Sequence, residues 1–199
     1  MKKHFSFALI ASGCMMMFAC NDATNGDADD TTTDTNRSVT TDTSNTNTPS
    51  TAAPADSATV MFLTKAASGG MMEVQLGQLA QQQAQSQRVK DFGAMMVRDH
   101  GKANDELKSL ASGKNVTLSD SLMPDHKRHV TDLQNRKGSA FDRAYMTMMV
   151  QDHSKDIQDF EKASNTLADG EVKAFATRTL PVLRAHLDSA TAINKNRNK

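Results

Sequence analysis

The sequence is poor in the residues on which several classes of protein depend. Its 199 residues include no Trp, one Tyr and two Cys, and 23 basic side chains balance 23 acidic ones. Nucleic-acid-binding surfaces combine clustered basic side chains with aromatic ones that stack on bases, so this composition predicts no nucleic-acid partner. The chain also contains no G-x-S-x-G motif and no glycine-rich phosphate loop ending in Lys. The common serine-hydrolase and nucleotide-binding patterns are therefore absent.

Both cysteines lie near the N-terminus. Cys14 and Cys20 fall within and just after an apolar stretch, Phe5–Ala19, that follows two lysines. A basic start followed by such a stretch is typical of a signal peptide, and the stretch is too short for a permanent membrane helix. The remainder of the chain has no cysteine, so the exported domain can form no disulfide.

Residues 1–20 resemble the signal peptide of a bacterial lipoprotein. Cys20 follows a small residue at the polar edge of the apolar stretch, where such a cysteine is lipidated and becomes the new N-terminus. We therefore predict Cys20 as the lipid attachment site, the membrane as a partner, and a cell-envelope location on an outer membrane. Cys14 has a better small-residue context but would leave "MMMFA" beyond the cut. A soluble exported protein is the other alternative.

Residues 21–58 have the composition of a tether. This segment is rich in Ser, Thr and Asn, has seven Asp against the single Arg37, and offers Val39 as its one large apolar side chain. Such a segment cannot bury enough apolar surface to offset the entropy of ordering it. We expect a disordered acidic linker that separates the domain from the membrane.

Helical periodicity runs through the rest of the chain. Apolar residues recur at spacings of three, four and seven, which predicts helices in five segments: 58–85, 86–113, 124–138, 139–167 and 170–193. Ser139 and Asp142 form a predicted capping box at the start of the fourth. Because no strand pattern occurs, the sequence predicts an all-α fold, an up-down four-helix bundle over 59–194 with an extra short helix, followed by a tail at 195–199.

Two of the long segments repeat each other. "FGAMMVRDHGKANDEL", from Phe92 to Leu107, aligns without a gap on "YMTMMVQDHSKDIQDF", from Tyr145 to Phe160. The repeat indicates two helices of one bundle that present similar faces to a common interior.

Three histidines occupy places in the apolar stripes of three different helices. They are His100, His153 and His186, and Glu73 lies beside the stripe of the first helix. Counted from their connecting turns, Glu73 and His100 lie 13 and 14 residues away, and His153 and His186 lie 16 and 17 away, which predicts similar depths. Inward ligands on facing helices are how bundles build metal sites, and imidazole with carboxylate suits Zn, Fe or Cu. The alternative is a set of buried neutral histidines that fix the packing register.

Neighbouring residues add two further hypotheses. Consecutive helical residues point about 100° apart, so Asp99 and Asp152 are expected to support the metal ligands rather than to bind the ion. Met96 precedes His100 by four residues, and Met149 precedes His153 by four. Thioether with imidazole would favour Cu(I), although buried methionines are more often core filling.

Four stretches carry a resemblance to a known family: "FLTKAASGGMMEVQLGQLA", "VKDFGAMMVRDHGKANDELKSLA", "AFDRAYMTMMVQDH" and "VKAFATRTLPVLRAHL". Together they resemble the bacterial family DUF4142, whose members are described as outer-membrane or exported proteins. The resemblance implies a ferritin-like bundle and an envelope location, but no activity. Ferritin-like di-iron proteins carry Glu-x-x-His pairs, and here Val97, Val150 and Leu183 stand in place of that glutamate.

The sequence thus leaves three hypotheses. The first is a lipid-anchored envelope protein whose bundle binds or senses a ligand, with one metal ion in its core. The second is a metal-dependent oxidase or peroxide-handling bundle that uses the same four residues, and the third is a structural module for envelope stress. No residue is assigned a catalytic role, no protein partner is identified, and a homo-oligomer is compatible with the sequence.

Overall fold

The computed structural model describes residues 54–196, which form five α-helices and no strand. The helices are α1 (Ser57–Gln83), α2 (Gln87–Ser112), α3 (Pro124–Gln134), α4 (Gly138–Thr166) and α5 (Gly170–Lys195). The predicted four-helix bundle with an extra short helix is confirmed. In the described part of the chain no helix is both long and apolar enough to cross a membrane. The predicted signal peptide, Cys20 and most of the tether lie outside the described residues.

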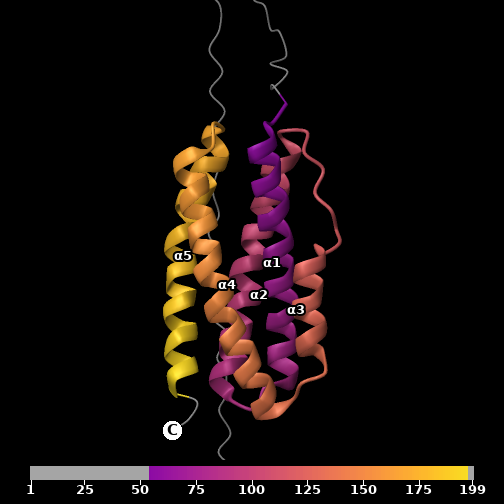
Figure 1. Ribbon diagram of the computed structural model, residues 1–199, viewed down its shortest axis with the longest axis vertical. Coiled ribbons are helices and arrows are strands. Elements are labelled where there is room, and N and C mark those ends of the chain that lie inside the picture. The colour runs from indigo at the N-terminus through magenta and orange to yellow at the C-terminus, as the bar shows by residue number, and fades with distance from the viewer. Residues whose placement is uncertain (1–53, 197–199) are drawn as a thin grey trace, which may run out of the picture. The chain divides into compact units, whose positions relative to one another are not determined.

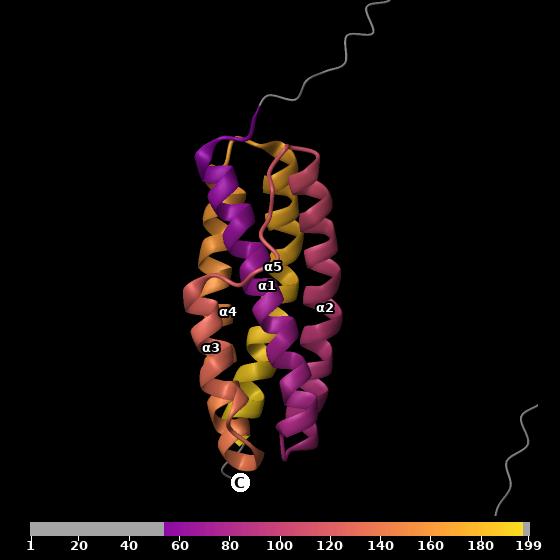
Figure 2. The ribbon, with the colours of Figure 1, turned by 90° about the vertical axis from the view of Figure 1, so that its right-hand side faces the viewer.

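The four long helices run side by side along one axis (Figure 1). α1 packs against α2 and α4, and α5 packs against α4 and α2, so that α2 and α4 lie across a diagonal. The connection from α2 returns along the outside of the bundle and leads into α3, which covers the lower half of α1 (Figure 2). This one long crossover allows α2 and α4 to run in the same direction while every neighbouring pair stays antiparallel.

The interior is divided into two apolar clusters. One lies toward the α1–α2 turn and is built around Met72, Phe92 and Tyr145, and the other lies toward the opposite end around Leu63, Phe160 and Phe175. Burial of these side chains stabilises the bundle by about 25 cal/mol for each Å² of apolar surface removed from water. The structure places a polar layer between two cores.

Side chains cap some of the helix ends and not others. Asp169 caps α5 by accepting hydrogen bonds from the backbone N–H groups of Glu171 and Val172. The predicted capping box at Ser139 is wrong, because α4 begins at Gly138 and its N-cap, Lys137, makes no side-chain cap bond. Gly138 has φ +59°, a conformation that favours glycine.

Asp142 has a different role from the predicted one. Its buried carboxylate accepts hydrogen bonds from the backbone N–H groups of Gln85 and Ser86, at 3.1 and 2.9 Å. These two amides belong to the α1–α2 turn and have no partner inside a helix. The carboxylate thus connects the start of α4 to the α1–α2 turn. Asp142 makes these hydrogen bonds between helices instead of a capping bond within its own helix.

Glycines set the distance between α1 and α2. A Cβ added to Gly77 would lie 2.6 Å from the carbonyl oxygen of Gly93, and one added to Gly93 would lie 2.7 Å from both Gly77 O and Ala80 Cβ. The two backbones therefore cross in close contact. Gly77 lies one turn from Glu73, so this crossing also fixes the separation of Glu73 on α1 from His100 on α2.

Candidate metal centre

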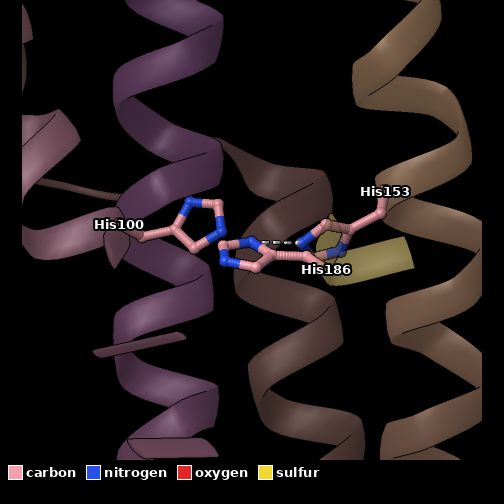
Figure 3. A group of neighbouring side chains, drawn as sticks. All are labelled: His100, His153 and His186. Carbon is pink, nitrogen blue, oxygen red and sulfur yellow. Dashed lines mark hydrogen bonds between the residues drawn. The ribbon is translucent and has the colours of Figure 1, made fainter. Parts of the chain in front are cut away.

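The polar layer between the two apolar clusters holds all four predicted ligands. Glu73 comes from α1, His100 from α2, His153 from α4 and His186 from α5, and their exposed fractions are 1%, 7%, 0% and 2%. Figure 3 shows the three imidazole rings turned toward one another between the helices. One ring nitrogen from each histidine lies within 4.8 Å of the other two. The structure thus brings together side chains that are up to 113 positions apart in the sequence.

The His153 ring is oriented by its own helix. Its Nδ1 lies 3.0 Å from the carbonyl oxygen of Met149. A carbonyl only accepts hydrogen bonds, so Nδ1 carries the proton and donates it. Nε2 of His153 is consequently the atom with the free lone pair, and it faces the centre of the bundle.

Asp99 orients His186 in the same manner. Nε2 of His186 donates to Oδ2 of Asp99 at 3.0 Å, which leaves the lone pair on Nδ1. Burial opposes ionisation of Asp99, but hydrogen bonds from Arg98 and His186 outweigh it and hold the pKa of the carboxyl below its usual value. Carboxylate–histidine pairs of this kind are the usual support of a metal-binding imidazole.

Glu73 performs the corresponding task for His100. Oε2 of Glu73 lies 2.7 Å from Nδ1 of His100, so Nδ1 carries the proton when Glu73 is ionised. Nε2 of His100 is then the free lone pair, and it is buried without a hydrogen-bond partner. With Glu73 ionised, each of the three histidines has one nitrogen held by an acceptor and one left unprotonated. Burial raises the pKa of Glu73, and a cation in the layer would favour its ionised form.

The unprotonated nitrogens of His153 and His186, together with one oxygen of Glu73, lie at distances that suit a metal ion. Nε2 of His153 lies 3.3 Å from Nδ1 of His186 and 3.4 Å from Oε1 of Glu73. Two donors bound to a tetrahedral metal at about 2.0–2.1 Å lie about 3.3–3.4 Å apart. Since neither nitrogen of the His153–His186 contact has a proton to donate, this contact is not a stabilising hydrogen bond by itself. A cation at the centre would turn the repulsion of these lone pairs into binding.

Protonation of the three histidines does not supply a positive charge in place of that cation. Burial lowers the pKa of His100 to about 4, and burial together with the charges of His100 and His186 lowers that of His153 to about 3. Burial also lowers the pKa of His186. All three imidazoles are therefore neutral at pH 7, which is the form that binds metals.

Two acidic residues of α4 adjoin this layer. Asp152, predicted as a supporting residue, and Asp156, which sequence reasoning missed, approach Glu73 so that one oxygen from each lies within 4.8 Å of the others. Asp156 follows His153 by three residues, a spacing that places both side chains on one side of a helix. The spacing of three residues between His153 and Asp156 could have identified Asp156 from the sequence. The aligned residue of the α2 repeat is Ala103, so comparing the two repeats does not point to Asp156.

The methionines lie in the apolar cluster beside the histidines. Met96 and Met149 are fully buried and belong to the cluster around Tyr145. The backbone carbonyl of Met149 accepts the hydrogen bond from Nδ1 of His153. This arrangement gives Met149 a supporting role through its backbone.

Comparison with known proteins identifies a family and a fold. The sequence profile of a family described as "Domain of unknown function (DUF4142)" matches residues 44–193. Comparison with curated proteins gives no match. Among solved structures, the chain is similar to the crystal structure of a DUF305 fragment from Deinococcus radiodurans. The TM-score is 0.64 at 13% identity, over 72% of this chain and 99% of that fragment. At this identity the likeness shows the helical fold alone.

Proposed function

Because the chain belongs to the DUF4142 family, whose function is unknown, we propose the function that its buried histidines support, the binding of one transition-metal ion. The ligands are His100, His153 and His186, with Oε1 of Glu73 as a fourth donor. The observation that carries this proposal is the pair of unprotonated nitrogens, Nε2 of His153 and Nδ1 of His186, facing each other at 3.3 Å in a buried layer. Three imidazoles and a carboxylate suit Zn²⁺, Fe²⁺ or Cu²⁺.

The donor set favours binding over structural packing alone. A packing role requires each buried polar atom to have a partner, because an unsatisfied one costs about 1–3 kcal/mol. In this layer Nε2 of His100 and Oε1 of Glu73 have no hydrogen-bond partner. One ion would satisfy both atoms and the two facing nitrogens.

Metal analysis of protein purified without chelator tests the proposal. We expect one transition-metal ion per chain, and its loss in His153→Ala and in His186→Ala. His126→Gln is the matched control. His126 belongs to α3, forms a hydrogen bond with Ser68 of α1, and lies outside the proposed ligand set. Retention of metal by both alanine variants, or a metal-free wild type that binds no added Zn²⁺, Fe²⁺ or Cu²⁺, would refute the proposal.

Thermal stability provides a second test. A ligand at 100 times its Kd stabilises the folded state by about 2.7 kcal/mol. Added Zn²⁺ should therefore raise the melting temperature of chelator-treated wild type and leave that of His153→Ala unchanged. If the histidines only fix the packing register, His153→Ala will melt lower than wild type by the same amount with and without Zn²⁺.

A small cavity favours oxidase or peroxide-handling activity as a second candidate. It has a volume of about 30 Å³ and is lined by Glu73, His100 and Asn104, among others. This volume accommodates about one water molecule, and hence a small ligand beside the ion. The metal-loaded protein should then consume hydrogen peroxide faster than His153→Ala; equal rates would leave binding as the function.

Anchoring to the cell envelope through Cys20 is a separate part of the proposal. The signal-like residues 1–20 and the polar composition of residues 21–58 support it. Cys20→Ser should release the protein from membranes, while Cys14→Ser should not. Release from membranes by Cys14→Ser and not by Cys20→Ser would identify Cys14 as the lipid attachment site.

A further inference from the structure

A second group of ligands adjoins the histidines, and all its members are acidic. Glu73 on α1 and Asp152 and Asp156 on α4 place one carboxylate oxygen each within 4.8 Å of one another. Glu73 is 1% exposed, and the two aspartates are half-buried. Up to three negative charges therefore share a space that is largely removed from water.

No Lys or Arg of residues 54–196 forms an ion pair with these three carboxylates; the contacts of Glu73 are with the neutral rings of His100 and His153. Lys65 and Lys155, whose charges act on this side of α4, are paired with Asp159, at 2.5 and 2.9 Å. Burial raises the pKa of Glu73, Asp152 and Asp156, and repulsion among the carboxylates raises those of Glu73 and Asp156 further. The cluster thus lacks a counter-charge from the described protein.

Several oxygens around the cluster also lack hydrogen-bond donors. Oε1 of Glu73, Oδ2 of Asp152 and Oδ1 of Asn104 are buried without a partner. The cavity of about 30 Å³ is lined by Glu73, Asn104 and Asp156 together with His100. Buried acceptor oxygens without a donor are unfavourable for an anion and suitable for a cation.

We propose that Asp152, Asp156 and Glu73 hold a second divalent cation beside the histidine-bound ion, with Glu73 shared between the two. Carboxylate oxygens favour hard ions such as Mn²⁺ or Mg²⁺, whereas the three imidazoles favour Zn²⁺ or Cu²⁺. This inference rests on the proposed function, because the first ion orders Glu73. The two ions are nevertheless separable by their different ligands.

Sequential loading of the full chain tests the second site. The protein is freed of metal with a chelator, dialysed, loaded with one equivalent of Zn²⁺ and titrated with Mn²⁺, whose free six-line EPR signal disappears on binding. We expect one Mn²⁺ per chain. Asp156→Asn should weaken Mn²⁺ binding at least tenfold and keep one Zn²⁺, whereas the control Asp159→Asn, a neighbouring acid of the same helix, should retain both ions.

The outcomes separate the two proposals. Bound Zn²⁺ with equal Mn²⁺ affinity in wild type and Asp156→Asn would overturn the second site and leave the first intact. Absence of Zn²⁺ binding in wild type would overturn both. Retained Zn²⁺ and unchanged helical circular dichroism in Asp156→Asn would exclude misfolding as the cause of a lost Mn²⁺. With Cu²⁺ in the histidine site, the weak, broad signal of bound Mn²⁺ should change through magnetic coupling to the nearby Cu²⁺; an unaltered signal would overturn the close placement of the two ions.

Discussion

Gly93 of α2 lies where α1 and α2 are closest, so Gly93→Ala perturbs both the packing and the candidate site. The added Cβ would lie 2.7 Å from the carbonyl oxygen of Gly77 and from Ala80 Cβ, and both are fixed parts of α1. The helices must therefore move apart. Gly101 in the same helix is the matched control, because a Cβ there meets nothing within 4 Å.

The comparison isolates the steric cost. Replacing a helical glycine by alanine gains about 1 kcal/mol from helix propensity at either position. Overpacking costs about 1–3 kcal/mol, and this cost applies only to Gly93→Ala. We expect Gly101→Ala to be more stable than wild type, and Gly93→Ala to be less stable than Gly101→Ala by about 2 kcal/mol.

Urea unfolding of the chelator-treated protein, followed by circular dichroism, measures this gap. With an m-value of about 2 kcal/mol per M, a difference of about 2 kcal/mol separates the midpoints by about 1 M. Separation of α1 from α2 would also lengthen the 2.7 Å contact between Glu73 and His100, so Gly93→Ala should bind metal more weakly than Gly101→Ala. Equal midpoints for the two variants would refute the close approach of these helices.

Three further predictions concern single side chains. Asp142→Ala should lower the free energy of unfolding by about 1–3 kcal/mol, because two turn amides lose their acceptor, while Ser139→Ala stays within about 0.5 kcal/mol of wild type; equal urea midpoints would contradict this. Asp169→Ala should cost about 0.5–2 kcal/mol through loss of the α5 cap, whereas Ser86→Ala should cost less, since the Ser86 side chain makes no cap bond; thermal unfolding ranks the two, and the reverse order would refute the assignment. Asp99→Ala should weaken Zn²⁺ binding about 10–100-fold by releasing His186, and Asp99→Asn, which keeps an oxygen acceptor, should lose less; calorimetric titration with unchanged affinity in Asp99→Ala would remove its supporting role.

The helices were predictable because their signals are local. Apolar spacing depends on residues within a few turns, and the segments predicted at 86–113 and 124–138 correspond to α2, Gln87–Ser112, and α3, Pro124–Gln134. The candidate ligands were predictable for a related reason. A histidine in an apolar stripe must face the interior, and similar distances from the turns set similar depths in antiparallel neighbours.

The tertiary structure decided what each polar atom faces. Asp142 reads as a cap in the sequence, but the unpaired amides of the α1–α2 turn bring its carboxylate to that turn. The repeat likewise gives Asp99 and Asp152 the same place, yet Asp99 holds His186 while Asp152 lies beside Glu73 and Asp156. Periodicity fixes which face of a helix is buried, because that depends on the helix's own geometry. Which atoms meet there depends on the neighbouring helix, so only the packed bundle determines the proton on each histidine and the carboxylates that surround the site.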